Sequence, residues 1–399
     1  MKFKRLIPVP TQVVLSLALA IWFLGCVPGA SARKRNLVYI NGNITATGQN
    51  AVIALINDGA GNMSPVAGGP FATGGTGVAG AGDLLDDAQW DADGEIILNP
   101  AGTLLFAVNG HSNDFSVFSV NADGSLTLVP GSPFPSGGPQ PASLGYKDNA
   151  LRDGNSLLFV ANKDSDPFQS PSIPNYTSFR VSPDGVPAMN VGSTFSVPAD
   201  SSPSQIIMPS NARTNFFAIQ FKGRNLSAYS FTKAGIITAV SSLDTIATNV
   251  GGVLHPTART LYITQPGVDK LTVTNYDATY QLSLGASQKS GDAPCWATTN
   301  KAGTRLYTGE TISGSVTVYD ITNPDSPLKL QHLVLSGDLP YATHTSLDPT
   351  ESFLYVLDRE GVLHALDVAL DGTVSEPRAA YNLGLPPGTV ALGIAVLRK

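Results

Sequence analysis

Cysteine is nearly absent from this chain, which carries only Cys26 and Cys295 among its 399 residues. Because Cys26 lies in a predicted export signal, where it would be removed or acylated, we expect no disulfide bond in the folded protein. Stability then has to come from burial of a hydrophobic core, which a chain of this length can supply.

Charge is also scarce: charged residues make up 14% of the chain, and the formal net charge is −6. The sequence predicts no extended basic patch, which argues against nucleic acid and anionic membranes as partners. No two histidines or cysteines have the spacing of zinc ligands, and the glycine-rich stretch 74–77 does not lead into a helical pattern. We therefore expect no cofactor and no metal site.

The amino terminus has the three parts of an export signal. Positive charges in the first five residues precede an apolar run over 13–24 and a small-x-small cleavage pattern at 30–32. We predict that residues 1–32 are a cleaved signal peptide and that 33–399 form the mature, secreted or periplasmic domain without a membrane span. Two alternatives stay open, an uncleaved membrane anchor and a lipoprotein held by a lipid on Cys26.

Glycine and proline are plentiful, with 40 and 29 copies, and they separate short apolar runs. One short sequence motif recurs seven times. It consists of two or three apolar residues around an aromatic residue, followed by a polar residue. Its aromatic residues are Tyr39, Phe106, Phe159, Phe217, Tyr262, Tyr307 and Tyr355. Successive copies are 67, 53, 58, 45, 45 and 48 residues apart. A period near 45 residues is typical of propeller blades.

Each repeat divides into four predicted strands, A to D. In one repeat these are residues 96–98, 103–109, 115–120 and 126–129, with an Asp-Gly hairpin between C and D. We therefore predict an all-β fold, a seven-bladed β-propeller with four-stranded antiparallel blades.

The phase of the repeats predicts how the ring closes. The first repeat begins directly on a strand B at 37–40, and the chain ends on an unpaired strand at 392–397. We expect this C-terminal strand to become strand A of the first blade, which removes an open sheet edge. Two insertions, at 74–95 and 164–175, are predicted to be surface loops.

Antiparallel pairing places the start of strand A and the end of strand B at the same mouth of the central channel. That mouth is predicted to gather Asn109, His111, Lys163, Gln265, Glu310, His344, Asp358 and Arg359. Opening a lactone requires a base for water and positive charge where the oxyanion develops. His344 is the candidate base, Arg359 the charge clamp, and Glu310 or Asp358 the orienting carboxylate. Asp358, His111, Lys163 and Asn109 are candidate substrate-binding residues, and a solvated polar rim is the alternative.

Other polar residues have weaker interpretations. The acidic segment that ends at Asp91, Asp93 and Glu95 could bind calcium, but it lacks the full calcium-loop register, so a solvated loop is preferred. Cys295 is expected to be a buried, inert thiol. Of the remaining histidines, His255 is expected in a turn. His332 and His364 are expected toward the blade exteriors.

The chain resembles the seven-bladed lactonase-type propellers. The resemblance lies in Pro-Cys-Trp-Ala at 294–297 leading into 302–307, and in the segment 120–126 followed by Pro-Gly-Ser-Pro-Phe at 130–134. The family includes 6-phosphogluconolactonases, carboxymuconate-cyclising enzymes and exported bacterial members. Its catalytic members carry a Pro-Arg-His motif, an Asn-Glu and an Asn-Arg. Here His344 lacks the preceding Arg, Asp358-Arg359 resembles the Asn-Arg, and Glu310 stands one position early.

These observations lead to two functional hypotheses. The resemblance implies a small-molecule lactone as substrate, and the lack of a clustered Arg/Lys phosphate site argues against a phosphorylated one. The alternative is a non-catalytic propeller that binds an extracellular ligand, glycan or protein, because one scaffold hosts many functions. In either case we expect a monomer. Convergence of His344, Glu310 and Arg359 on one solvent-filled point would favour the enzyme.

Overall fold

The computed structural model describes residues 1, 35–81, 88–150, 153–210, 214–245, 247–337 and 341–399. The chain divides into two units, 1–33 and 34–399. The predicted signal peptide and Cys26 lie outside the described residues. Helical structure in the described part comprises two short 3-10 turns, η1 (Ala88–Trp90) and η2 (Pro266–Val268). None of the described helices has the length and apolarity needed to cross a membrane.

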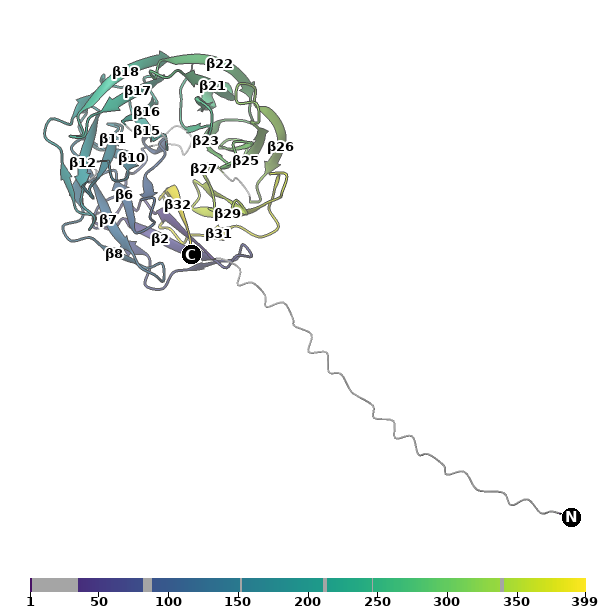
Figure 1. Cartoon of the computed structure of the whole chain (residues 1–399). Helices are drawn as coiled ribbons and strands as arrows, with labels where there is room; N and C mark the ends of the chain where they lie inside the picture. The colour runs from purple at the N-terminus through teal and green to yellow at the C-terminus, as the bar shows by residue number, and fades with distance from the viewer. Residues whose placement is uncertain (2–34, 82–87, 151–152, 211–213, 246, 338–340) are drawn as a thin grey trace. The chain divides into compact units, whose positions relative to one another are not determined.

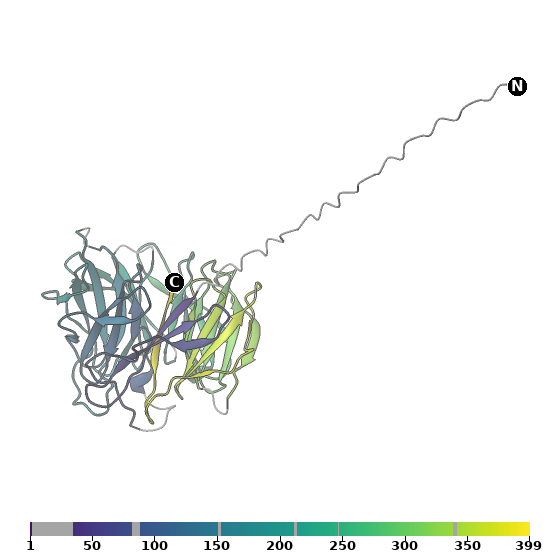
Figure 2. The ribbon, with the colours of Figure 1, turned by 90° about the horizontal axis from the view of Figure 1, so that it is seen from below.

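The second unit consists of seven antiparallel sheets arranged in a ring around a central axis, as Figure 1 shows. The region along this axis, between the innermost strands, is called the central channel. In the perpendicular view of Figure 2 the strands run steeply along the axis of the ring. The prediction of a seven-bladed propeller is therefore confirmed. From the channel outward, blade 1 comprises β32 (Leu392–Arg398), β1 (Asn36–Asn41), β2 (Ala51–Asn57) and β3 (Met63–Pro65), with β4 (Phe71–Ala72) also on β2.

The other blades repeat this order without a contribution from the C-terminus. Blade 2 comprises β5 (Ile96–Leu98), β6 (Leu104–Asn109), β7 (Asp114–Val120) and β8 (Leu126–Leu128), with β9 (Phe134–Pro135) on β7. Blade 3 comprises β10 (Pro141–Lys147), β11 (Ser156–Asn162), β12 (Asn175–Val181) and β13 (Pro187–Met189), with β14 (Phe195–Ser196) on β12. Blade 4 comprises β15 (Pro203–Ile207), β16 (Asn215–Gln220), β17 (Asn225–Phe231) and β18 (Ile237–Asp244).

The last three blades complete the ring. Blade 5 comprises β19 (Gly252–Leu254), β20 (Thr260–Gln265), β21 (Lys270–Tyr276) and β22 (Leu282–Lys289). Blade 6 comprises β23 (Pro294–Thr299), β24 (Arg305–Glu310), β25 (Ser315–Asp320) and β26 (Leu328–Val334). Blade 7 comprises β27 (Ala342–Leu347), β28 (Phe353–Asp358), β29 (Val362–Val368) and β30 (Val374–Ser375), with β31 (Tyr381–Asn382) on β29.

The ring closes as the repeat phase predicts. β32 pairs antiparallel with β1, with Leu397 opposite Leu37 and Ala395 opposite Tyr39. The first and last segments of the ring thus share one sheet, and pairing satisfies the inner edge of β1.

The repeated aromatic residue holds neighbouring blades together. All seven copies are fully or almost fully buried. Where the residue is tyrosine, its hydroxyl reaches the next blade: Tyr39 donates to the Gly124 carbonyl and Tyr307 to the Gly372 carbonyl. A buried ring with its hydroxyl satisfied explains why the repeat keeps an aromatic residue at this position.

The two predicted surface loops have different outcomes. In the second, at 164–175, Phe168 and Ile173 are exposed, as expected for a surface loop. The end of the first is not on the surface, because Trp90, Asp91 and Glu95 are buried. That part of the prediction is wrong, and it bears directly on the site.

Candidate functional site

Residues 88–95, here called the channel segment, cross the central channel before β5 begins. The Ala92 carbonyl accepts a hydrogen bond from Trp296 Nε1 on β23 at 2.5 Å and lies 3.1 Å from His344 Nε2 on β27. On the other side, Asp93 N donates to the carbonyl of Ser204 on β15, and Leu144 N on β10 donates to the Gly94 carbonyl. Inner strands of four blades therefore hold this short segment.

The local sequence explains why the channel segment turns inward. Trp90 is only 4% exposed and packs against Val78, Val390 and Leu392. Burial of a tryptophan side chain stabilises the position of the segment by an order of about 2 kcal/mol. This single aromatic residue was the sequence signal for a buried segment, and an interpretation based on the acidic residues alone missed it.

An ion pair anchors the first half of the channel segment. Arg359 Nη2 lies 2.7 Å from Asp91 Oδ1, and the guanidinium lies over the Trp90 ring at 5.9 Å from its centroid. Arg359 Nη1 is buried and has no hydrogen-bond partner within the described part of the chain. The guanidinium thus retains an unused donor, which could bind a carbonyl, carboxylate or oxyanion.

Lys163 supports the same half of the segment. Its Nζ donates to the Asp91 carbonyl and lies over the Phe221 ring, 5.2 Å from the centroid. Burial lowers the pKa of Lys163 to about 8, although the carboxylates of Asp91 and Glu95 oppose this shift. Near neutral pH the ammonium therefore remains a positive charge behind the pocket wall.

A pocket of about 270 Å³ opens beside the ion pair, at the mouth where strands A begin and strands B end. Its lining is mostly apolar, and Asp91 and Arg359 are the charged residues among those described. The lining residues are Asp91, Phe221, Thr248, Val250, Pro266, Gly267, Ala293, Cys295, Thr311, Ile312 and Arg359. An apolar pocket with a few convergent polar groups is the usual form of a small-molecule site.

Cys295 lines this pocket as a thiol. It is 4% exposed, and Thr311 Oγ1 donates to its sulfur at 3.0 Å. Burial raises the pKa of Cys295 to about 12, so the reactive thiolate is negligible at neutral pH. The predicted burial of this cysteine is confirmed.

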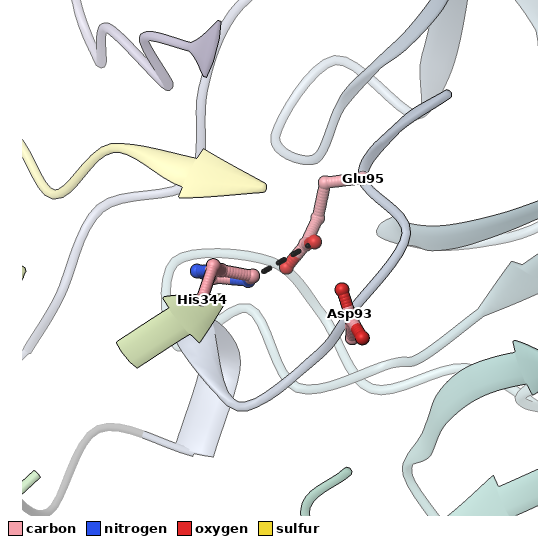
Figure 3. Close-up of side chains that lie close together, drawn as sticks. All are labelled: Asp93, Glu95 and His344. Carbon is pink, nitrogen blue, oxygen red and sulfur yellow. Dashed lines mark ion pairs between the residues drawn. The ribbon is translucent and has the colours of Figure 1, made fainter. Parts of the chain in front are cut away.

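The second half of the channel segment forms a cluster with His344, shown in Figure 3. Glu95 Oε2 lies 3.3 Å from His344 Nε2, and one ligand atom each from Asp93, Glu95 and His344 lie within 4.8 Å of one another. The Trp296 ring stacks on the imidazole at a centroid distance of 4.5 Å. Carboxylate oxygens and an imidazole nitrogen are ligands for divalent cations.

Burial and mutual charge perturb this cluster. Burial raises the pKa of Asp93 to about 6. For His344, burial alone lowers the pKa, but the carboxylates of Glu95 and Asp93 outweigh burial and raise the pKa above its ordinary value. The structure therefore concentrates negative charge around one buried imidazole.

Three predicted site residues are held by hydrogen bonds at the ends of their strands and are not among the residues that line the pocket. Glu310 accepts hydrogen bonds from Ser290 Oγ, Gly291 N and Ser315 Oγ. Asn109 donates to Asp114 Oδ1 and Ser116 Oγ on β7.

Asp358, the third of these residues, accepts hydrogen bonds from the backbone N–H groups of Glu360 and Val362. These side chains, each at the end of a strand B, close the hairpin to strand C.

The other predicted residues are split between sites. Arg359 lines the pocket and Lys163 lies behind its wall, whereas His344 lies at the second half of the channel segment and is not among the residues that line the pocket. His111 pairs with Asp166 at 2.7 Å, and its side chain is 40% exposed. The structure thus brings Arg359 and Lys163 together through Asp91, a residue that the sequence analysis assigned to a solvated loop.

The predictions for His364 and for the acidic segment are wrong. His364 was expected toward the blade exterior, but it is 1% exposed and its Nδ1 lies 2.6 Å from Glu376 Oε1. The acidic segment was expected to be solvated, but Asp91 and Glu95 are buried because Trp90 draws them into the channel. His255 is a turn residue as expected, with Nδ1 accepting from Ala258 N.

The comparisons with known proteins agree with this architecture. Residues 218–379 match the family model described as lactonase, 7-bladed beta-propeller. No curated protein sequence gives a significant match.

Solved structures match nearly the whole chain. A protein of Lactobacillus plantarum has 15% identity and a TM-score of 0.69 over 91% of this chain and 99% of its own. A candidate 6-phosphogluconolactonase of Bacteroides fragilis has 13% identity and a TM-score of 0.68 over 93% and 99%. A periplasmic gluconolactonase of Pseudomonas aeruginosa has 13% identity and a TM-score of 0.68 over 90% and 99%. The chain is therefore a seven-bladed propeller, and its residues 218–379 match the sequence model of the lactonase propeller family.

Proposed function

We propose that this propeller hydrolyses a small lactone in the pocket beside Asp91 and Arg359. The observation that supports it is the buried ion pair at the wall of a mostly apolar pocket, with one guanidinium nitrogen that has no partner among the described residues. The family match and the gluconolactonase among the similar structures support the same reaction class.

The chemistry divides between two side chains. The carboxylate of Asp91 accepts a proton from a water molecule, whose oxygen attacks the lactone carbonyl carbon. Arg359 donates hydrogen bonds to the oxyanion that develops. The ring C–O bond then breaks, and the proton held by Asp91 passes to the leaving alkoxide, which yields a hydroxy acid. The positive charge of Lys163, fixed behind the pocket wall, favours the anionic intermediate and product.

The pocket also sets the substrate class. Phe221, Val250 and Ile312 supply apolar surface, and Arg359 is the one cation among the described lining residues. A doubly charged phosphate group would meet this one cation, which Asp91 already partly neutralises, and no cluster of positive charges among the described lining residues. An unphosphorylated lactone with an apolar substituent fits this lining best.

The test is proton release by the purified protein from a panel of plain, alkyl-substituted, sugar and phosphorylated lactones. Arg359→Gln should lower kcat/KM by about 100-fold or more, the usual cost of losing one oxyanion donor. Asp91→Asn should have an effect of at least that size. Arg180→Gln, which removes an exposed cation paired with Asp153, is the matched control and should keep full activity. A folded wild-type protein without turnover on any lactone would rule out the proposal.

One observation favours a second candidate, a non-catalytic propeller that binds its ligand in the same pocket. Glu310 is directed into blade 6 and His344 lies away from the pocket lining, so the three predicted catalytic residues do not converge. For this candidate, equilibrium binding of lactones or hydroxy acids without turnover is expected. Arg359→Gln would then weaken affinity and change no rate.

We also infer that the protein acts outside the cytoplasm, in line with the three-part amino terminus and with the periplasmic gluconolactonase of similar fold. Mass spectrometry of the exported protein tests this. Cleavage after Ala32 gives one mass, lipid on Cys26 gives another, and retention of the full chain in the cytoplasm contradicts export.

A further inference from the structure

We propose that Asp93, Glu95 and His344 bind one divalent transition-metal ion, of the zinc or manganese kind, inside the central channel. The cluster joins the channel segment to β27, so a bound ion would tie blade 2 directly to blade 7. This proposal does not depend on lactone hydrolysis.

The first observation is the convergence of ligand atoms. A carboxylate oxygen of Asp93, a carboxylate oxygen of Glu95 and an imidazole nitrogen of His344 lie within 4.8 Å of one another. Ligands about 2.1 Å from a common ion lie roughly 3 to 4 Å apart, so a contraction of less than 2 Å completes the site. The Ala92 carbonyl, which accepts a hydrogen bond from Trp296 Nε1 and lies 3.1 Å from His344 Nε2, would be the fourth ligand and the third oxygen.

The second observation is the state of Glu95. This side chain is 1% exposed, and neither of its carboxylate oxygens accepts a hydrogen bond from any described residue. It forms an ion pair with His344 at 3.3 Å, and the Nδ1 of that imidazole is buried and also lacks a partner in the described structure. Buried carboxylates without donors are rare in folded proteins, because leaving one unsatisfied costs several kcal/mol. A cation at the focus of the cluster would supply the missing partner.

The surroundings position the ligands. Gln205 Nε2 donates to Asp93 Oδ2 at 2.9 Å, which orients that carboxylate. The Trp296 ring covers the imidazole face. Ligand orientation by outer hydrogen bonds and packing is common in protein metal sites.

The donor set decides the class of ion. Calcium prefers six to eight oxygen ligands, whereas imidazole nitrogen with two carboxylates suits zinc or manganese. Sequence spacing predicts no metal site here, because metal-ligand spacing patterns involve histidines and cysteines that are close in sequence. Here the histidine lies 249 positions after Glu95 (344 − 95).

The test uses the full-length protein freed of metal by a chelator. ZnCl₂, MnCl₂ and CaCl₂ are added separately, with isothermal titration, thermal unfolding and metal content after gel filtration as readouts. One zinc or manganese ion per chain is expected, with a thermal midpoint that rises with metal concentration. Cobalt in place of zinc should give a visible absorption band.

Variants make the test specific. Glu95→Gln keeps the size of the side chain and should weaken the affinity for zinc or manganese by about 100-fold or more, as should His344→Gln. His332→Gln, a histidine that faces Glu310 in blade 6, is the matched control and should bind like wild type. Thermal unfolding without metal verifies that each variant folds. The proposal is wrong if wild type takes up no ion, if calcium binds most tightly, or if Glu95→Gln binds as well as wild type.

Discussion

Glu310 and Glu95 are two buried glutamates in very different surroundings. Glu310, at 0% exposure, receives hydrogen bonds from Ser290, Gly291 and Ser315. Glu95, at 1% exposure, receives none from the described residues and lies beside the imidazole of His344 and the carboxylate of Asp93. The first arrangement is what a structural carboxylate requires. The second leaves binding capacity unused inside the channel, which is where a ligand or ion is expected.

The pKa of Glu310 follows from its contacts. Burial alone would raise this pKa, but hydrogen bonds from Ser315, Thr317, Ser290 and Gly291 outweigh it and hold the pKa below its ordinary value. Gly291 is required for this arrangement, because a Cβ at that position would lie 2.0 Å from Glu310 Oε2.

The largest predicted effect comes from replacing Glu310, the glutamate whose carboxylate accepts several hydrogen bonds. Glu310→Gln replaces an acceptor oxygen by an amide NH₂ that faces donor groups, so buried donors lose their partner. We expect a loss of about 3 to 5 kcal/mol in the free energy of unfolding, since bonds to charged groups contribute about 1.5 to 3 kcal/mol each. Urea unfolding measures it, with Glu360→Gln, a change at an exposed glutamate, as control. A loss below about 1 kcal/mol would contradict the structural role.

A second prediction concerns His364, whose ring lies between two carboxylates. Burial lowers its pKa, but hydrogen bonds and charge from Asp358 and Glu376 outweigh burial and raise the pKa to about 9. A folded-state pKa above the unfolded value of about 6.5 stabilises the protein fully below pH 6.5, and this stabilisation is lost as the pH rises through 9. The contribution is roughly 3 kcal/mol.

The measurement is the unfolding free energy of wild type minus that of His364→Gln, because other titrating groups cancel in this difference. It should fall between pH 6 and pH 10. Parallel pH profiles for the two proteins would show that the histidine does not carry this charge in the folded state.

The smallest expected effect on the free energy of unfolding concerns the other glutamate, Glu95. In metal-free buffer Glu95→Gln should change the free energy of unfolding by less than about 1 kcal/mol, because relief of the cost of burying a carboxylate that accepts no hydrogen bond from the described residues offsets the loss of its ion pair with His344. Urea unfolding beside Glu310→Gln gives the contrast directly. A cost equal to that of Glu310→Gln would mean that Glu95 has partners in solution that stabilise it.

The repeat architecture could be predicted from local residues. The seven copies of the aromatic motif predict the number of blades. The strand B at 37–40 and the unpaired strand at 392–397 predict how the ring closes. These features follow from short-range alternation and turn chemistry, which each repeat carries in its own sequence. The polar residue that ends each strand B was also recognised, but its side chain turns toward strand C, as at Glu310 and Asn109.

The sequence by itself determined that seven similar blades form a ring and that its two ends share a sheet. Only the tertiary structure decided what fills the channel. Arg359 meets Asp91 across 268 positions, and His344 meets the Ala92 carbonyl across 252. No periodic sequence pattern predicts such contacts, because the insertion that makes them does not repeat. Its position depends on the burial of Trp90 and on the inner strands that ring closure places around it.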